Sequence, residues 1–310
     1  MPDRRRARIA RPVAVALALA VAACGGSPDP SPSATTALDD DVVTVASFDF
    51  PESELLAEIY GQALEAAGFE VELQLGVGPR DLVQPALVRG LVEFVPEYAG
   101  TALEFMSAGP RPTSDAATTH DALLRQLRDE PMTALAPAPA QDANAVVVTA
   151  ELAEDLGLAT ISDLRDVAPQ LVFGGPPGCP ERPLCLAGLQ STYGLSFESF
   201  MPLDVGGPLT HQALEGEHID VALLFTTDPR LADDDLVVLA DDRSLQPAEN
   251  VTPLVRAEVV ARGGDTLVDA VDAVSARLTT DGLRDLNAEV AAGTPRARVA
   301  GDWLRDEGLA

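Results

Sequence analysis

Apolar positions recur along the chain at two spacings, one typical of buried strands and the other of amphipathic helices. The first part of the chain is predicted to form strands at 42–47, 69–75 and 91–95 and helices at 51–67 and 81–89. Gly68 ends the first helix, while Pro85 interrupts the pattern of the second. This β-α-β-α-β order favours a parallel, doubly wound sheet.

The same alternation returns in the middle of the chain, between two proline-containing interruptions at 136–140 and 246–250. Within this block, strands are predicted at 145–148, 171–173, 219–225 and 236–239, and helices at 186–193 and around 211–215. A mostly helical tail follows the second interruption, with helices at 267–278, 282–291 and 296–304. Two interruptions that enclose such a block suggest one α/β lobe inserted into another.

The N-terminal residues have the layout of a lipoprotein export signal. Five arginines precede the apolar run 13–22, and small residues lead to Cys24. The run is too short to span a bilayer, which takes about 20 residues. An ordinary signal peptide followed by a chance cysteine is the alternative. We expect a signal peptide at 1–23, lipidation of Cys24 and a flexible Gly/Pro/Ser/Thr-rich tether at 24–40.

The charge of the chain narrows the choice of partners. The net charge is −28, lysine is absent, and the basic N-terminal stretch makes the remainder more acidic still. Nucleic acid and anionic membrane surfaces would repel such a protein. No second apolar run has membrane-spanning length, so we expect a lipid-anchored, extracytoplasmic body that contacts the cell membrane through its lipid alone.

Several separated motifs resemble, in order, those of the osmoprotectant-binding proteins of ABC importers, the receptors for glycine betaine, choline and carnitine. The motifs lie at 46–52, 58–64, 78–80, 96–103, 161–164, 202–204, 225–228 and 241–242. The resemblance implies a type II periplasmic-binding-protein fold, in which two α/β lobes with doubly wound sheets are joined by two crossover segments and hold ligand between them. The lobes would comprise 41–138 with 251–310, and 139–250.

Proteins of this family hold a quaternary ammonium in an aromatic cage and its carboxylate in a hydrogen-bonding clamp, since ring faces attract a methylated cation. The resemblance places eight residues at the ligand: Tyr98 and Phe225 as rings, Asn144 and Glu249 where further tyrosines are expected, Thr101 and Arg182 in the clamp, Phe48 where some members have lysine, and Asp142 as an acid beside the cage.

The departures from the family pattern affect the expected ligand. The cage has fewer rings than usual, although Phe48 and Phe50 can replace them. Glu249 and Asp142 could pair with a cation directly, which would suit a protonated amine. A binding protein for an amino-acid-like amine is therefore an alternative. Tyr98 and Phe225 could instead be rings of the hydrophobic core. Glu249 could instead be a residue at the rim of the site.

Cys179 and Cys185 are expected to form a disulfide, because two cysteines in an exported chain most simply pair. The small loop would then hold Arg182 in place. The spacing and the scattered histidines disfavour a metal or redox site.

Catalytic motifs of the common hydrolase, phosphate-binding and zinc-protease types are absent from the sequence. We therefore expect a monomeric receptor, with no enzymatic activity or cofactor, that delivers a small quaternary amine to the permease subunits of an ABC importer. A sensor or structural lipoprotein with the same fold, and an α/β hydrolase, are the alternatives.

Overall fold

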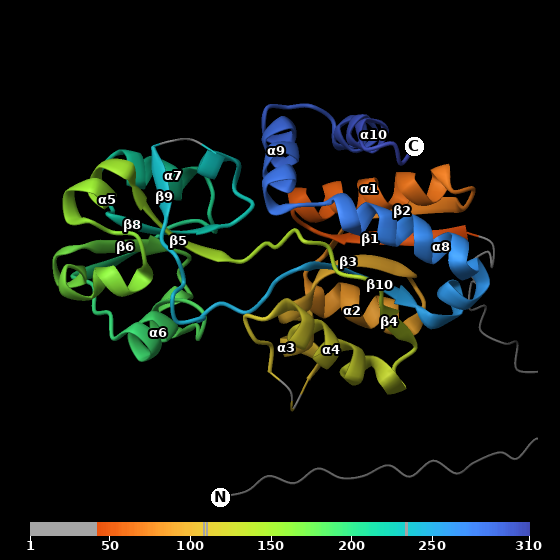
Figure 1. Cartoon of the computed structure of the whole chain (residues 1–310), viewed down its shortest axis with the longest axis horizontal. Coiled ribbons are helices and arrows are strands. Elements are labelled where there is room, and N and C mark those ends of the chain that lie inside the picture. The colour runs from red at the N-terminus through yellow and green to blue at the C-terminus, as the bar shows by residue number, and fades with distance from the viewer. Residues whose placement is uncertain (1–41, 108, 110, 233–234) are drawn as a thin grey trace, which may run out of the picture. The chain divides into compact units, whose positions relative to one another are not determined.

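The computed structural model describes residues 42–107, 109, 111–232 and 235–310 (Figure 1). The expected signal peptide, Cys24 and the tether lie outside these residues. The helices and strands are β1 (Val42–Phe48), α1 (Pro51–Ala66), β2 (Glu70–Gly78), α2 (Arg80–Arg89), β3 (Phe94–Tyr98), α3 (Ala99–Met106), α4 (Ala116–Gln126), β4 (Met132–Ala134), β5 (Asn144–Thr149), α5 (Ala150–Leu156), β6 (Val172–Gly175), α6 (Leu186–Gly188), β7 (Ser199–Pro202), α7 (Pro208–Glu215), β8 (Val221–Phe225), β9 (Leu236–Val238), β10 (Val251–Arg256), α8 (Ala257–Arg277), α9 (Thr280–Ala291) and α10 (Arg296–Asp306).

The first sheet has the strand order β2-β1-β3-β10-β4. β1 runs parallel to β2 and β3, whereas β10 is antiparallel to both β3 and β4. Helices α1 and α8 cover one face and α2, α3 and α4 the other (Figure 1). β3 is therefore buried along its whole length, as expected for a strand covered on both sides.

The second sheet has the order β7-β6-β8-β5-β9, in which β5 is antiparallel to both neighbours. Alternate residues of β5 enter different cores. Ala145 and Val147 pack in the cluster that contains Leu214 of α7, and Val146 and Val148 pack in the cluster on the opposite face. This period of two is the geometry of a strand buried on both faces.

Two crossover segments connect the sheets, one after β4 and one before β10 (Figure 1). They lie side by side as a short antiparallel ladder. The Ala138 N–H donates to the Val251 carbonyl at 2.8 Å, and the Asp142 N–H donates to the Glu249 carbonyl at 3.1 Å. The crossovers thus support each other through backbone hydrogen bonds.

The sequence does not predict strands β4, β7 and β10 or helices α3, α4 and α5, and three further features differ from the expectation. The first sheet is not wholly parallel, because β10 enters it on returning from the second. β3 begins at Phe94, three residues later than predicted, and extends through Pro96, which pairs with Pro253 of β10. The Arg256 N–H donates to the Glu93 carbonyl and the Ala99 N–H to the Asn250 carbonyl. The alternation of an antiparallel ladder between these two ends makes Pro96 and Pro253 a non-hydrogen-bonded pair. Pro96 therefore needs no N–H towards β10. α8 begins ten residues before the predicted helix, with a break at Gly264 (φ 57°).

Among the described residues, no helix is both long enough and apolar enough to span a membrane.

The structure joins Cys179 and Cys185 by a disulfide inside the second sheet's core, with Cα atoms 5.2 Å apart. We expect the double variant Cys179→Ala/Cys185→Ala to lower the free energy of unfolding by about 2–3 kcal/mol, because the unfolded chain loses its cross-link. Urea denaturation of variant and wild type would measure the difference. Wild type under reducing conditions is the control and should approach the variant. Full thiol labelling of unreduced, denatured wild type would contradict the bridge.

Candidate functional site

Three aromatic rings gather where two neighbouring parallel strands end. Phe48 closes β1, Phe50 precedes α1 and Tyr98 closes β3. The Phe48 and Phe50 centroids are 5.9 Å apart with an interplanar angle of 9°, and those of Phe50 and Tyr98 are 6.2 Å apart with an angle of 27°. We call these residues the ring stack. Phe48 and Tyr98 are buried while Phe50 is half-buried, so Phe50 is the most accessible ring. Strand ends of this kind are where open α/β sheets bind ligands.

An ion pair between Arg80 and Glu97 packs against the Phe48 ring of the ring stack. The Arg80 guanidinium lies 4.9 Å from the Phe48 ring centroid and donates to both Glu97 oxygens, at 2.6 and 2.9 Å. Glu97 is almost fully buried and also accepts from the Tyr98 N–H at 2.8 Å. This two-bond contact is the strong bidentate form of the arginine–carboxylate ion pair, so the Arg80 charge is paired with Glu97.

The carboxylate of Glu52 joins the ring stack to more distant parts of the chain. Glu52 lies in the first turn of α1 and accepts from the Tyr98 hydroxyl and from the Asn287 amide, both at 2.6 Å. The same Asn287 amide donates to the Thr227 carbonyl at 3.2 Å. Glu52 is therefore held by hydrogen bonds from β3 and α9 rather than by a cation.

Two further acids come from the crossover segments. Asp142 accepts from the Thr227 hydroxyl at 2.8 Å. Glu249 accepts from Thr101 twice, from its hydroxyl at 2.6 Å and from its N–H at 2.9 Å. We call Glu52, Asp142 and Glu249 the acid cluster. In the part of the chain that the structure describes, no side chains converge as a set of metal ligands, so the cluster is not arranged as a metal centre.

Burial sets the electrostatics of the acid cluster. Desolvation raises the pKa of Glu249 to about 7, against the opposing effects of the Thr101 hydrogen bonds and the Arg80 charge. Desolvation and then the Glu52 charge hold the pKa of Asp142 well above its usual range. Desolvation also raises the pKa of Glu52, although its hydrogen-bond donors oppose the shift. A bound cation would lower the pKa values of these three carboxylates, because it stabilises their ionised forms.

The structure brings together five of the eight residues placed at the ligand by the sequence: Phe48, Tyr98, Thr101, Asp142 and Glu249. Phe225 lies at the end of β8, half-buried, paired in register with Asn144 of β5. Arg182 is exposed in the loop closed by the disulfide. No hydrogen bond or ion pair among the described residues links Asn144, Arg182 or Phe225 to the ring stack or the acid cluster.

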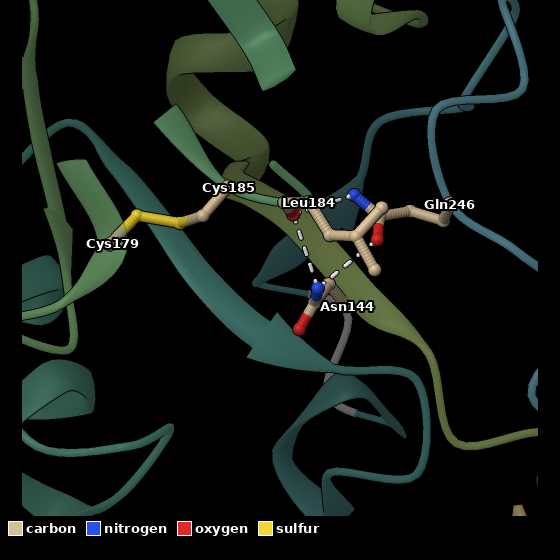
Figure 2. The surroundings of a disulfide bond; sticks show 5 residues. All are labelled: Asn144, Cys179, Leu184, Cys185 and Gln246. Carbon is tan, nitrogen blue, oxygen red and sulfur yellow. Dashed lines mark hydrogen bonds between the residues drawn. A yellow bond between two sulfur atoms is a disulfide. The ribbon is translucent and has the colours of Figure 1, made fainter. Parts of the chain in front are cut away.

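Figure 2 shows how the Asn144 side chain is used. Its amide donates to the Leu184 carbonyl at 3.2 Å and to the Gln246 side chain at 3.1 Å, and Gln246 also donates to Leu184 at 3.0 Å. Leu184 directly precedes Cys185, so the disulfide loop is attached to β5 and to the second crossover through a backbone carbonyl.

Sequence reasoning gave no ligand-site role to Glu52, Arg80, Glu97, Thr227 and Asn287. Four of these lay in motifs shared with the osmoprotectant receptors, and that was the available signal. Asn287 lay outside those motifs, 235 residues from its partner Glu52. Glu52 lies in the first turn of a helix, where an acidic residue is ordinarily explained by its favourable interaction with the helix dipole. Its position in the sequence therefore provided no reason to expect its hydrogen bonds with Tyr98 and Asn287.

The chain is similar to known substrate-binding proteins of ABC transporters. Residues 41–306 match the family described as the substrate binding domain of ABC-type glycine betaine transport systems. The glycine-betaine-binding protein of Pseudomonas aeruginosa is 29% identical over 282 residues, which cover 87% of this chain and 89% of that protein. The ergothioneine transport permease/ergothioneine binding protein of Helicobacter pylori is 25% identical over 88% of this chain, which spans only 49% of that longer protein.

A crystal structure of a glycine betaine/carnitine/choline ABC transporter protein has the same fold, with a TM-score of 0.79 at 24% identity, over 86% of this chain and 99% of that one. The fold is thus the expected type II periplasmic-binding-protein fold. Because the family match extends over most of the sequence, this protein belongs to the family of substrate-binding domains of ABC-type glycine betaine transport systems.

Proposed function

We propose that this chain is a lipid-anchored, extracytoplasmic receptor that delivers a small organic cation of the quaternary-amine type to the permease subunits of an ABC importer. The family and the relatives support a transport role. Residues 41–138 with 251–310 would form one lobe and 139–250 the other. The ligand would contact the ring stack and the acid cluster.

The observation that carries this proposal is the ring stack beside the three carboxylates of the acid cluster. Hydrogen bonds satisfy these carboxylates, and none of them forms an ion pair with another described residue. A methylated ammonium cannot donate strong hydrogen bonds, and a ring face attracts it by roughly 0.5–2 kcal/mol per contact. The carboxylates add a long-range attraction for any cation, which is strengthened by their burial. Rings and acids together therefore favour an organic cation over a neutral solute.

Ring truncation tests the placement of the site. We expect Phe50→Ala and Tyr98→Ala each to weaken binding by about 1–3 kcal/mol, through lost cation–π contact and apolar burial. Phe225→Ala should do the same if the ring at the end of β8 also reaches the ligand. Calorimetry with choline, carnitine and glycine betaine would measure this. Phe105→Ala, which removes an exposed ring elsewhere on α3, is the control. Unchanged affinity in both Phe50 and Tyr98 variants would place the site elsewhere.

The raised pKa of Glu249 predicts how stability depends on pH. Between its usual value of 4.5 and about 7, the folded state binds more protons than the unfolded state. The free energy of unfolding should therefore fall as pH rises through this window, with a contribution from Glu249 on the order of 3 kcal/mol. Asp142 and Glu52, whose pKa values burial also raises, act in the same direction, and His120, whose pKa burial lowers, acts in the opposite one.

Urea denaturation of wild type and Glu249→Gln at pH 5 and pH 8 measures this contribution, together with the effect of the Glu249 charge on the pKa of Asp142. The variant should lose less stability than wild type over this interval. Cation affinity of the wild type should change the opposite way and rise with pH, because the ligand binds the ionised carboxylate. Equal pH slopes in both proteins would remove Glu249 from this explanation.

Anchoring is tested at Cys24. Cys24→Ser should leave the precursor unprocessed by the lipoprotein peptidase and unlipidated, because the acyl chain is attached through the cysteine sulfur. Mass spectrometry of membrane-extracted protein would compare wild type and variant, with Cys179→Ala as the matched control. Wild-type protein without an acyl modification would rule out the lipid anchor.

A further inference from the structure

The N-terminus of α3 is an anion-binding position, and a side chain of the protein occupies it. Thr101 is the third residue of α3, where backbone N–H groups have no partner within the helix. Its N–H and its hydroxyl donate to the two oxygens of Glu249. Helix N-termini favour negative charge at this place. Glu249 thus makes the two-pronged contact that the carboxylate of a ligand would make.

The backbone around Glu249 is shaped for this contact. A Cβ on residue 100 would lie 2.8 Å from the Ala248 carbonyl oxygen and 2.9 Å from Glu249 Oε1, distances that real Cβ atoms avoid. Only glycine at position 100 lets the second crossover approach α3 so closely. The Ala248 N–H also donates to the Thr113 carbonyl at 2.8 Å, which holds the crossover against the loop before α4. Glu249 is 6% exposed.

The surrounding charges disfavour a second carboxylate. Glu97 accepts from Nε and Nη2 of Arg80 and so pairs with its charge. Arg284 donates to the Thr226 carbonyl and pairs with Asp281. A ligand carboxylate at Thr101 would have to displace Glu249 and would then stand among like charges, and like charges at close range cost several kcal/mol. A cation is attracted there by Glu249 and Asp142, while the nearby positive charge of Arg80 is paired with Glu97.

We propose that Glu249 determines the ligand class of this receptor: it takes the place of a ligand carboxylate at Thr101, so that the site accepts small organic cations without a carboxylate and rejects zwitterionic betaines. This inference rests on the proposed function, because it assumes that the ligand binds between the ring stack and the acid cluster. It goes further in naming the chemical class and the residue that selects it.

Choline and glycine betaine form a matched pair of probes, since both carry a trimethylammonium group and only glycine betaine carries a carboxylate. Calorimetry on the purified full chain at pH 8 should show that wild type binds choline at least about tenfold more tightly, the equivalent of 1.4 kcal/mol. Glu249→Ala opens both Thr101 donors to the ligand. The variant should weaken choline and strengthen glycine betaine, so that the ratio of dissociation constants falls by roughly tenfold or more.

Glu249→Gln separates the effect of the Glu249 charge from the effect of its hydrogen bonds with Thr101. Glutamine removes the charge but can still accept from Thr101, so choline should weaken while glycine betaine gains less than in Glu249→Ala. Glu154→Ala removes one exposed carboxylate on α5 and should leave the ratio unchanged. Thermal melting without ligand confirms that each variant is folded.

The selecting role of Glu249 and the proposed receptor function fail under different results. Equal binding of both probes by wild type, or an unchanged ratio in folded Glu249→Ala, would overturn the role of Glu249 while leaving a quaternary-amine receptor in place. If wild type bound neither these probes nor any other organic cation, the proposed function would be refuted, and the inference with it.

Discussion

The structure around the rings depends on keeping carboxylates buried, and each is satisfied in a different way. A buried carboxylate without partners is costly, so each one dictates the position of its donors. Glu97 uses a guanidinium, Glu52 a phenol and an amide, and Glu249 a helix N-terminus. These donors come from α2, β3, α9 and α3. The acids therefore organise the edge of the first sheet and do not merely line it.

The same constraint ties the candidate site to the connections between the sheets. Asp142 and Glu249 lie on different crossovers, and the Asp142 N–H donates to the Glu249 carbonyl. Thr227, directly after β8, holds Asp142 by its hydroxyl and accepts from Asn287 by its carbonyl. A cation that binds these carboxylates thus acts on the segments through which the two sheets are joined, which is where hinge residues of binding proteins absorb backbone change.

The sequence predicted the fold well where the information was local. Strand patterns, glycine stops and proline-rich interruptions depend on neighbouring residues, and the family motifs located Tyr98 and Thr101. Long-range pairing was inaccessible: the predicted third strand ends at Val95, whereas β3 continues through Pro96, which pairs with Pro253 of β10. The sequence places Glu249 either at the ligand or at the rim, because its burial depends on the close approach allowed by Gly100. The disulfide loop engages its surroundings through the Leu184 carbonyl, which no side-chain pattern reports.

The charge of the whole chain and the chemistry of the candidate site point the same way. A net charge of −28 creates a negative potential that concentrates cations near the surface, over a range of about 8–10 Å at ordinary ionic strength. A zwitterion gains little from such a field because its two charges respond in opposite senses. Glu249 would extend this discrimination from the surface to the site, since it accepts from the Thr101 donors that a ligand carboxylate would otherwise use. Capture and selection would then rely on the same sign of charge, first at long range and then through one occupied helix terminus.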